Sequence, residues 1–111
     1  MVDWRDQEAT NQTVFREMNE WTKDAADARG EAVPSMETFV CECSDRGCTD
    51  PISLSRAEYE SVRSEATRFA IALDHENPEI DMVVVENERF TTVEKFHGSP
   101  RVIALATDPR R

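Results

Sequence analysis

Hydrophobic residues between positions 11 and 29 recur at alternating steps of four and three. The stripe consists of Val14, Met18, Trp21, Ala25 and Ala28, with Phe15 beside it. Because a helix turns once every 3.6 residues, this spacing predicts an amphipathic helix over about residues 11–29. Asn11 can cap its beginning and Gly30 can end it. We expect the stripe to pack on the protein's own sheet, although its heptad spacing also permits a homodimer or pairing with a partner's helix.

The middle of the chain carries several short runs that are typical of strands. They span residues 37–42, 51–54, 69–73, 81–86 and 90–96. β-Branched and aromatic residues are common in these runs, and turn residues separate them. The last two runs flank Asn87-Glu88-Arg89, which predicts a hairpin.

Two further helices are expected. Ser55-Arg56-Ala57-Glu58 is a capping box and predicts a short helix to about residue 64 or 65. Ser99 and Pro100 suit the start of a final helix over about residues 99–107. Residues 102–105 have no decisive hydrophobic period, so a final strand remains an alternative.

The composition is that of an ordinary folded protein. The 111 residues are 39% hydrophobic and 32% charged, and they contain no repeat or linker. We therefore expect one α+β domain over residues 1–111, with a long N-terminal helix packed on a small, mostly antiparallel sheet. The sheet and a metal-binding knuckle would occupy about residues 37–97.

The charge balance disfavours some partners. A formal net charge of −10 repels phosphate backbones and anionic lipid, so we expect no direct nucleic-acid binding, while a basic protein partner stays a hypothesis. The first thirty residues hold no long apolar run, and no segment approaches the ~20 apolar residues that span a bilayer. We expect a cytoplasmic protein that does not enter membranes.

Three cysteines lie within eight residues. Cys41, Cys43 and Cys48 have the spacing Cys-x-Cys-x4-Cys. Thiolates are strong zinc ligands, and alternation along a strand places the first two sulfurs on one side. An odd number of clustered cysteines does not suit a disulfide framework. We predict one zinc ion here, with inert thiols or a Cys43–Cys48 disulfide as alternatives.

A closed zinc site requires a fourth ligand. His75, His97, a carboxylate or water can supply it. We choose His75, because it follows a predicted buried strand that can carry it beside the knuckle. Its alternative interpretation is an exposed loop histidine. Glu76 follows His75, but position 79 holds a glutamate where the helical zinc-protease pattern requires a second histidine.

Two resemblances accompany this motif. The cysteine spacing resembles the zinc-binding post-SET segment of histone lysine methyltransferases, which implies a workable geometry and no shared activity. A longer pattern resembles a family of small uncharacterised bacterial proteins and implies that His75 belongs to a recurring motif. It includes the cysteines, Pro51-Ile52, Glu58-Tyr59, Phe69, His75-Glu76 and Val93-Glu94-Lys95.

The sequence favours a zinc-stabilised protein–protein interaction or regulatory module. It contains no glycine-rich phosphate loop and no Cys-x-x-Cys pair, and we expect no catalytic residues. Two other hypotheses remain. One is a small metalloenzyme with an open zinc position, and the other is a thiol-based redox or metal sensor.

Overall fold

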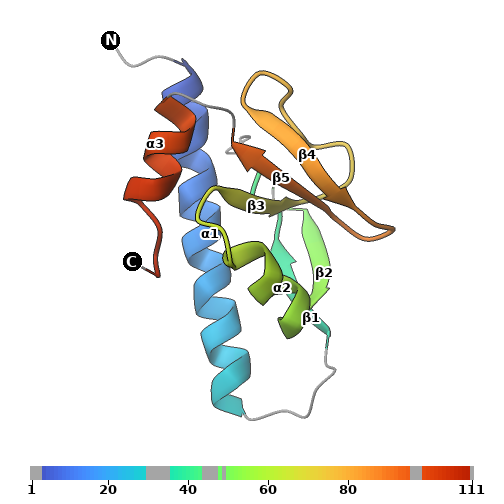
Figure 1. The fold of residues 1–111 in the computed structure, drawn as a ribbon. Coiled ribbons are helices and arrows are strands. Elements are labelled where there is room, and N and C mark those ends of the chain that lie inside the picture. Colours follow the sequence, from blue (N-terminus) through green and yellow to red (C-terminus); the bar gives the residue numbers. More distant parts are fainter. Residues whose placement is uncertain (1–3, 30–35, 44–47, 49, 96–98, 111) are drawn as a thin grey trace.

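The fold combines three helices with two small antiparallel sheets in the part of the chain that the structure describes. The computed structural model describes residues 4–29, 36–43, 48, 50–95 and 99–110. The elements follow in the order α1 (Trp4–Arg29), β1 (Met36–Val40), β2 (Pro51–Ser55), α2 (Arg56–Arg63), β3 (Arg68–Ile71), β4 (Asp81–Glu86), β5 (Thr91–Lys95) and α3 (Ser99–Ala106). The expected α+β class is confirmed. Helix α1 runs along the molecule, with α3 beside it and the strands on its other side (Figure 1).

Each sheet is antiparallel. Strands β1 and β2 pair in a register that sets Phe39 opposite Ile52. The second sheet has the order β3-β5-β4, and the predicted hairpin is its β4–β5 pair, with an irregularity between Val83 and Val85. After β1 the chain meets the edge of β3, where the Glu42 amide donates to the Ala70 carbonyl over 2.9 Å. The residues that follow β1 therefore join the two sheets.

Two apolar clusters form the core. One lies between the β1–β2 sheet and α2, and Phe39 stacks on Tyr59 there with ring centroids 4.5 Å apart. The other cluster contains two of the cysteines. Its buried members are Cys41, Cys43, Phe69, Ile71, Val93 and Ala104, with Cys48 and Ala72 packed against them.

Helix α2 begins with the predicted capping box. The Ser55 hydroxyl accepts from the Glu58 amide over 3.1 Å, and the Glu58 carboxylate accepts from the Ser55 amide over 2.8 Å. The helix buries Tyr59 and Val62, while Ala57 is exposed. The final helix is confirmed as α3, so the alternative strand over residues 102–105 is wrong.

The beginning of α1 differs from the prediction. The helix starts at Trp4, so Asn11 lies inside it and is no cap. Residues 4–10 lack a regular hydrophobic period but contain no glycine or proline, and Arg, Gln, Glu and Ala all favour helix. The helix propensity of residues 4–10 therefore extends α1 beyond its hydrophobic stripe. The predicted ending residue, Gly30, lies outside the described residues.

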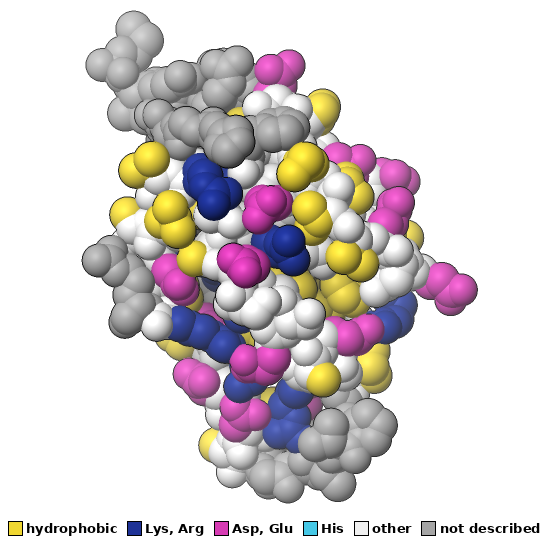
Figure 2. Space-filling model, viewed as in Figure 1, with side chains coloured by type: hydrophobic (Ala, Val, Ile, Leu, Met, Phe, Trp, Pro, Cys, Tyr) yellow, Lys and Arg dark blue, Asp and Glu magenta, His cyan; other side chains and the backbone are white. Residues whose placement is uncertain are grey.

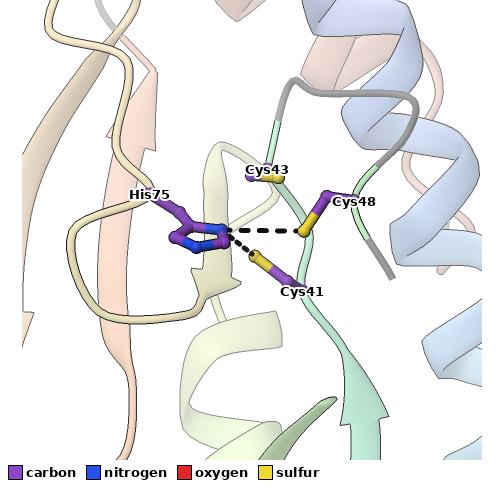
Figure 3. Close-up of side chains that lie close together, drawn as sticks. All are labelled: Cys41, Cys43, Cys48 and His75. Carbon is purple, nitrogen blue, oxygen red and sulfur yellow. Dashed lines mark hydrogen bonds between the residues drawn. The ribbon is translucent and has the colours of Figure 1, made fainter. Parts of the chain in front are cut away.

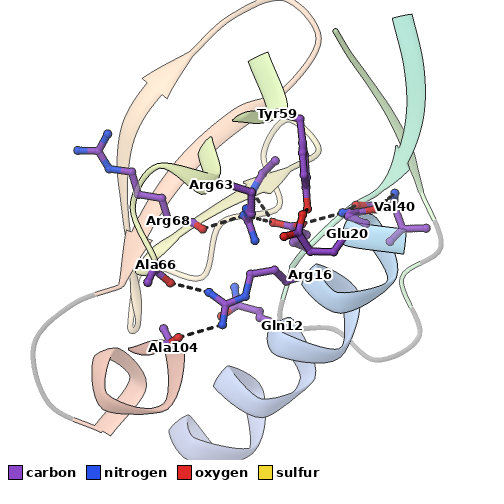
Figure 4. A network of polar contacts seen from close by, with 12 residues as sticks. Gln12, Arg16, Glu20, Val40, Tyr59, Arg63, Ala66, Arg68 and Ala104 are labelled. Carbon is purple, nitrogen blue, oxygen red and sulfur yellow. Dashed lines mark hydrogen bonds and ion pairs between the residues drawn. The ribbon is translucent and has the colours of Figure 1, made fainter. Parts of the chain in front are cut away.

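The predicted packing face of α1 is also wrong. The stripe faces solvent, with Val14, Met18 and Trp21 exposed to 54%, 41% and 66%. Among the α1 side chains that the structure describes, the buried ones are instead Gln12, Arg16, Asn19 and Ala26. Polar side chains can be buried when each finds a hydrogen-bond partner, and Figure 4 shows such partners around Arg16.

No helix in the described residues is long and apolar enough to cross a membrane.

Candidate metal centre

Three cysteines that are close in sequence and one distant histidine converge at one point. The sulfurs of Cys41, Cys43 and Cys48 and a ring nitrogen of His75 all lie within 4.8 Å of one another. The side chains come from three segments, which follow β1, precede β2 and follow β3 (Figure 3). The structure therefore brings together all four residues that the sequence singled out.

Strand geometry places the first two cysteines. Successive side chains along an extended chain point to opposite sides, so Cys41 and Cys43 share one side and Glu42 takes the other. Both cysteines are buried, whereas Cys48 is partly exposed. The Cys41 amide also donates to the Asp50 carbonyl over 3.0 Å, which returns the chain beside Cys41 shortly after Cys48.

A tight turn after β3 places His75. The His75 amide donates to the Ala72 carbonyl over 3.2 Å, and Asp74 has a positive φ of 66°. Aspartate tolerates this left-handed conformation better than most residues. The Ala72 amide donates to the Cys41 sulfur over 3.1 Å. Ala72 thus contacts both sides of the site and fixes the distance between them.

The distances suit a tetrahedral ion. The Nδ1 atom of His75 lies 3.5 Å from the Cys41 sulfur and 3.6 Å from the Cys48 sulfur. Around a tetrahedral zinc ion, sulfur lies at about 2.3 Å and a histidine nitrogen at about 2.0–2.1 Å, so the two ligands stand about 3.5–3.6 Å apart. These two distances match a tetrahedral zinc site, and the four ligand atoms, which all lie within 4.8 Å of one another, could hold a metal ion.

The thiols are difficult to ionise without a cation. The hydrogen bond with Cys43 and burial together raise the pKa of the Cys41 thiol, although the Ala72 amide acts in the opposite direction. Burial also raises the pKa of Cys48, and the Asp50 backbone opposes this effect. A bound divalent cation reverses this balance because it stabilises thiolates directly. A bound cation would thus favour the thiolate forms of Cys41 and Cys48, which burial alone disfavours.

The other nitrogen of His75 faces a carboxylate. Its Nε2 atom lies 3.3 Å from Asp50 Oδ2, while Nδ1 faces the sulfurs. Metal-binding histidines commonly donate their second ring N–H to a carboxylate, which fixes the tautomer and the ring orientation. Asp50 was not expected from the sequence. Its position two residues after Cys48 was the available signal.

No model of a known protein family, no curated protein and no solved structure matches this chain. The function of the site must therefore be inferred from its own geometry.

A buried polar network holds residues 41–43 on the side opposite the sulfurs of Cys41 and Cys43. The Glu42 carboxylate accepts from Arg63 over 2.8 Å, from the Ala70 amide over 2.9 Å and from Asn19 over 2.7 Å. Asn19 also exchanges two bonds of 2.8 Å with the Val40 backbone. One residue between two cysteines is thus tied to α1, α2 and β3. Neither Glu42 nor Arg63 was expected from the sequence.

The structure also bears on the disulfide and on the other candidate fourth ligands. All three cysteines are free, so the structure holds no Cys43–Cys48 disulfide. His97 lies outside the described residues. Among the described carboxylates, Asp50 approaches the site through His75. A cavity of about 180 Å³ between α2 and the β4–β5 hairpin is lined by none of the four clustered residues.

Proposed function

We propose that this protein binds one zinc ion through Cys41, Cys43, Cys48 and His75, and that the ion stabilises the fold of an interaction or regulatory module. The convergence of three sulfurs and one imidazole nitrogen within 4.8 Å carries this proposal. Three soft thiolates and one imidazole favour zinc over magnesium, calcium or manganese, which prefer oxygen ligands.

The closed ligand set supports a structural role. Catalytic zinc sites keep one position open for water or substrate, whereas structural sites use four protein ligands. Here His75 Nδ1 lies 3.5 and 3.6 Å from the sulfurs of Cys41 and Cys48, and Cys41 and Cys43 belong to an apolar core cluster. The small-metalloenzyme hypothesis has less support, because it requires an open position and an adjoining pocket.

In a protein of this size, the ion would add to the stability of the fold. A chain of 111 residues has a modest core, and the described part of α1 turns its apolar residues outward. Metal binding contributes directly to folding free energy when the site forms only in the folded state. A cytoplasmic location fits this proposal, because reducing conditions keep the thiols available for the metal.

Elemental analysis tests the proposal. Protein purified without a metal-binding tag should contain one zinc per chain, and Cys48→Ser should lose it. His75→Ala should bind zinc more weakly, whereas the matched variant His97→Ala should bind it normally. The pair of histidine variants decides between the two candidate fourth ligands.

Chelation tests the structural role separately. Because a ligand that binds only the folded state stabilises it, free zinc at a thousand times Kd adds about 4 kcal/mol to the free energy of unfolding. Removing zinc should therefore lower the melting temperature and reduce the dispersion of the amide signals in the NMR spectrum. An unchanged melting temperature after complete zinc removal would refute the structural role. Reversible zinc release by mild peroxide, with the fold intact, would favour the sensor hypothesis.

A further inference from the structure

Helix α1 has its polar and apolar faces in the reverse of the usual arrangement. The exposed stripe consists of Val14, Met18, Trp21, Ala25 and Ala28. At about 100° per residue, this stripe lies roughly opposite the face that carries Gln12, Arg16, Asn19 and Lys23. The protein's own core contacts that polar face and leaves the apolar stripe unpartnered in the described residues.

Contacts within the chain hold the polar face in place. Arg16 is buried and donates to the carbonyls of Ala66 and Ala104 over 2.5 and 2.9 Å (Figure 4). Gln12 donates to the buried Asp81 carboxylate over 3.5 Å. With Asn19 bound to the Glu42 segment, α1 cannot rotate to bury its stripe without breaking these bonds. The outward orientation of the stripe is therefore fixed by the fold.

The stripe is long and exposed enough to form an interface with another helix. Trp21 is 66% exposed, and the residues from Val14 to Ala28 extend over about 21 Å of helix. Tryptophan is among the residues that most often dominate binding energy at protein interfaces. The steps of four and three are those with which one helix packs along another.

The charge beside the stripe is negative. Glu17 and Asp24 are exposed, and each directly precedes a stripe residue, so both lie along the same edge. The basic side chains described on α1 point elsewhere: Arg16 is buried, and Lys23 pairs with Asp27 and Glu60 over 2.7 and 2.6 Å. Acidic side chains are also distributed over the face seen in Figure 2.

We infer that the exposed stripe of α1 is a docking surface for a basic amphipathic helix of a partner protein. The partner's apolar residues pack around Trp21 and Met18, and its lysines or arginines lie against Glu17 and Asp24. This inference rests on the proposed function as an interaction module and names the class of partner.

Charge decides between this partner and the other occupants. A second copy would bring together two chains that each carry a formal charge of −10, with the same acidic edge on both helices. An anionic lipid surface would meet the same repulsion. A basic helix instead gains attraction along the edge and apolar burial along the stripe, as paired helices do in coiled coils.

Three synthetic peptides of 21 residues test the inference. The first has leucine at heptad positions a and d and lysine at e and g, the second has glutamate at e and g, and the third is a scrambled form of the first. Binding to zinc-loaded protein is measured by fluorescence anisotropy of labelled peptide. In a Trp4→Phe background, the Trp21 emission provides a second reading, and it should shift to shorter wavelength.

The lysine peptide should bind with 1:1 stoichiometry, at least ten times more tightly than the scrambled or glutamate peptide. Trp21→Gln and Met18→Gln should each weaken it about tenfold, whereas Val85→Gln, at an exposed apolar residue on β4, should not. The double variant Glu17→Lys/Asp24→Lys should reverse the preference toward the glutamate peptide. Glu65→Lys/Glu88→Lys, which changes two exposed acids and the net charge equally, should preserve the original preference.

Equal binding of the scrambled peptide, or equal binding by the stripe variants, would overturn the inference. So would a dimer in sedimentation that Met18→Glu converts to monomer, because the second copy would then be the occupant. Zinc content is measured on every sample. Failure of peptide binding with one zinc per chain rejects only the docking surface, whereas peptide binding by a protein that binds no zinc rejects only the metal proposal.

Discussion

Glu42 Oε1 and Arg63 Nη2 lie 2.8 Å apart in an ion pair whose side chains are 0% and 2% exposed. The guanidinium also donates to the Arg68 carbonyl over 2.9 Å and lies over the rings of Tyr59 and Phe69. Burial removes both charges from water, so each depends on the other. The pair lies on the side of the chain opposite the sulfurs of Cys41 and Cys43 and joins the candidate metal centre to the core.

Glu42→Gln should destabilise the protein strongly. Removing one partner of a buried pair leaves the other charge uncompensated, which costs about 3–5 kcal/mol. Urea denaturation of the zinc-loaded protein measures the loss, and Glu86→Gln, at an exposed residue on β4, is the control. Zinc content should remain one per chain under native conditions, because all four ligands are retained. A loss below about 1 kcal/mol would show that Arg63 finds other partners.

Asp50→Asn should weaken zinc binding without changing the fold. Replacing the carboxylate partner of a metal-binding histidine typically costs 10–100-fold in affinity. Asp50 is 60% exposed, so we expect the lower end, about tenfold. Competition with a chromophoric chelator measures the affinity, with Glu88→Gln as the exposed control. Equal affinities for the wild type and Asp50→Asn would mean that the 3.3 Å contact does not orient His75.

Arg16→Lys should destabilise the attachment of α1 and α3. Arginine reaches two carbonyls and the Thr107 hydroxyl and lies 4.7 Å from the centre of the Phe69 ring, and lysine cannot reproduce this set. One buried carbonyl left without a donor costs about 1–3 kcal/mol. Hydrogen exchange should become faster in both helices and less so in the β4–β5 hairpin. Arg101→Lys on α3 serves as the control, and uniform exchange changes would contradict this assignment.

Glu60 should contribute to stability above pH 4.5 and lose that contribution in acid. The Arg110 guanidinium is the main cause that lowers the pKa of this carboxyl from 4.5 to about 2, with Lys23 adding to it. A lowered carboxyl pKa stabilises the fold above its ordinary value, and the effect is lost as pH falls toward about 2.

Glu60→Gln is therefore expected to be less stable than wild type at pH 6, by about 1 kcal/mol or less, because the site is partly exposed. The difference between the two proteins in urea should shrink as the pH falls below 4.5. Acid release of zinc affects both proteins, so their difference isolates Glu60. Glu65→Gln is the control, and a gap that widens in acid would contradict the sign.

The metal cluster could be predicted because its chemistry is local. Cys41, Cys43 and Cys48 lie within eight residues, and thiols in such spacing have few alternative uses. His75 was chosen from its place after a buried strand, and the structure brings it to the sulfurs. Asp50 and Glu42 were missed because a charged residue in an acidic chain is usually solvated, and sequence spacing does not reveal which one is buried.

The orientation of α1 could not be predicted from hydropathy. The stripe from Val14 to Ala28 has a regular helical period, yet which face is buried depends on the hydrogen-bond partners that the opposite, polar face finds in the rest of the chain. Asn19 donates hydrogen bonds to the Val40 carbonyl and the Glu42 carboxylate, and Arg16 donates one to the Ala104 carbonyl in α3. These partners lie far away in sequence, so no local pattern indicates them. A periodic stripe predicts a helix reliably but does not say which molecule covers it.

The alternation within Cys41-Glu42-Cys43 has a consequence for protein engineering. A single residue inserted between Cys41 and Glu42 would turn the Cys43 sulfur toward α1 and the Glu42 carboxylate toward the ligand cluster, because strand side chains alternate with a period of two. A graft of this centre into another scaffold would therefore have to carry Asn19 and Arg63 along with the four ligands. The minimal transferable unit is the metal centre together with its acidic anchor.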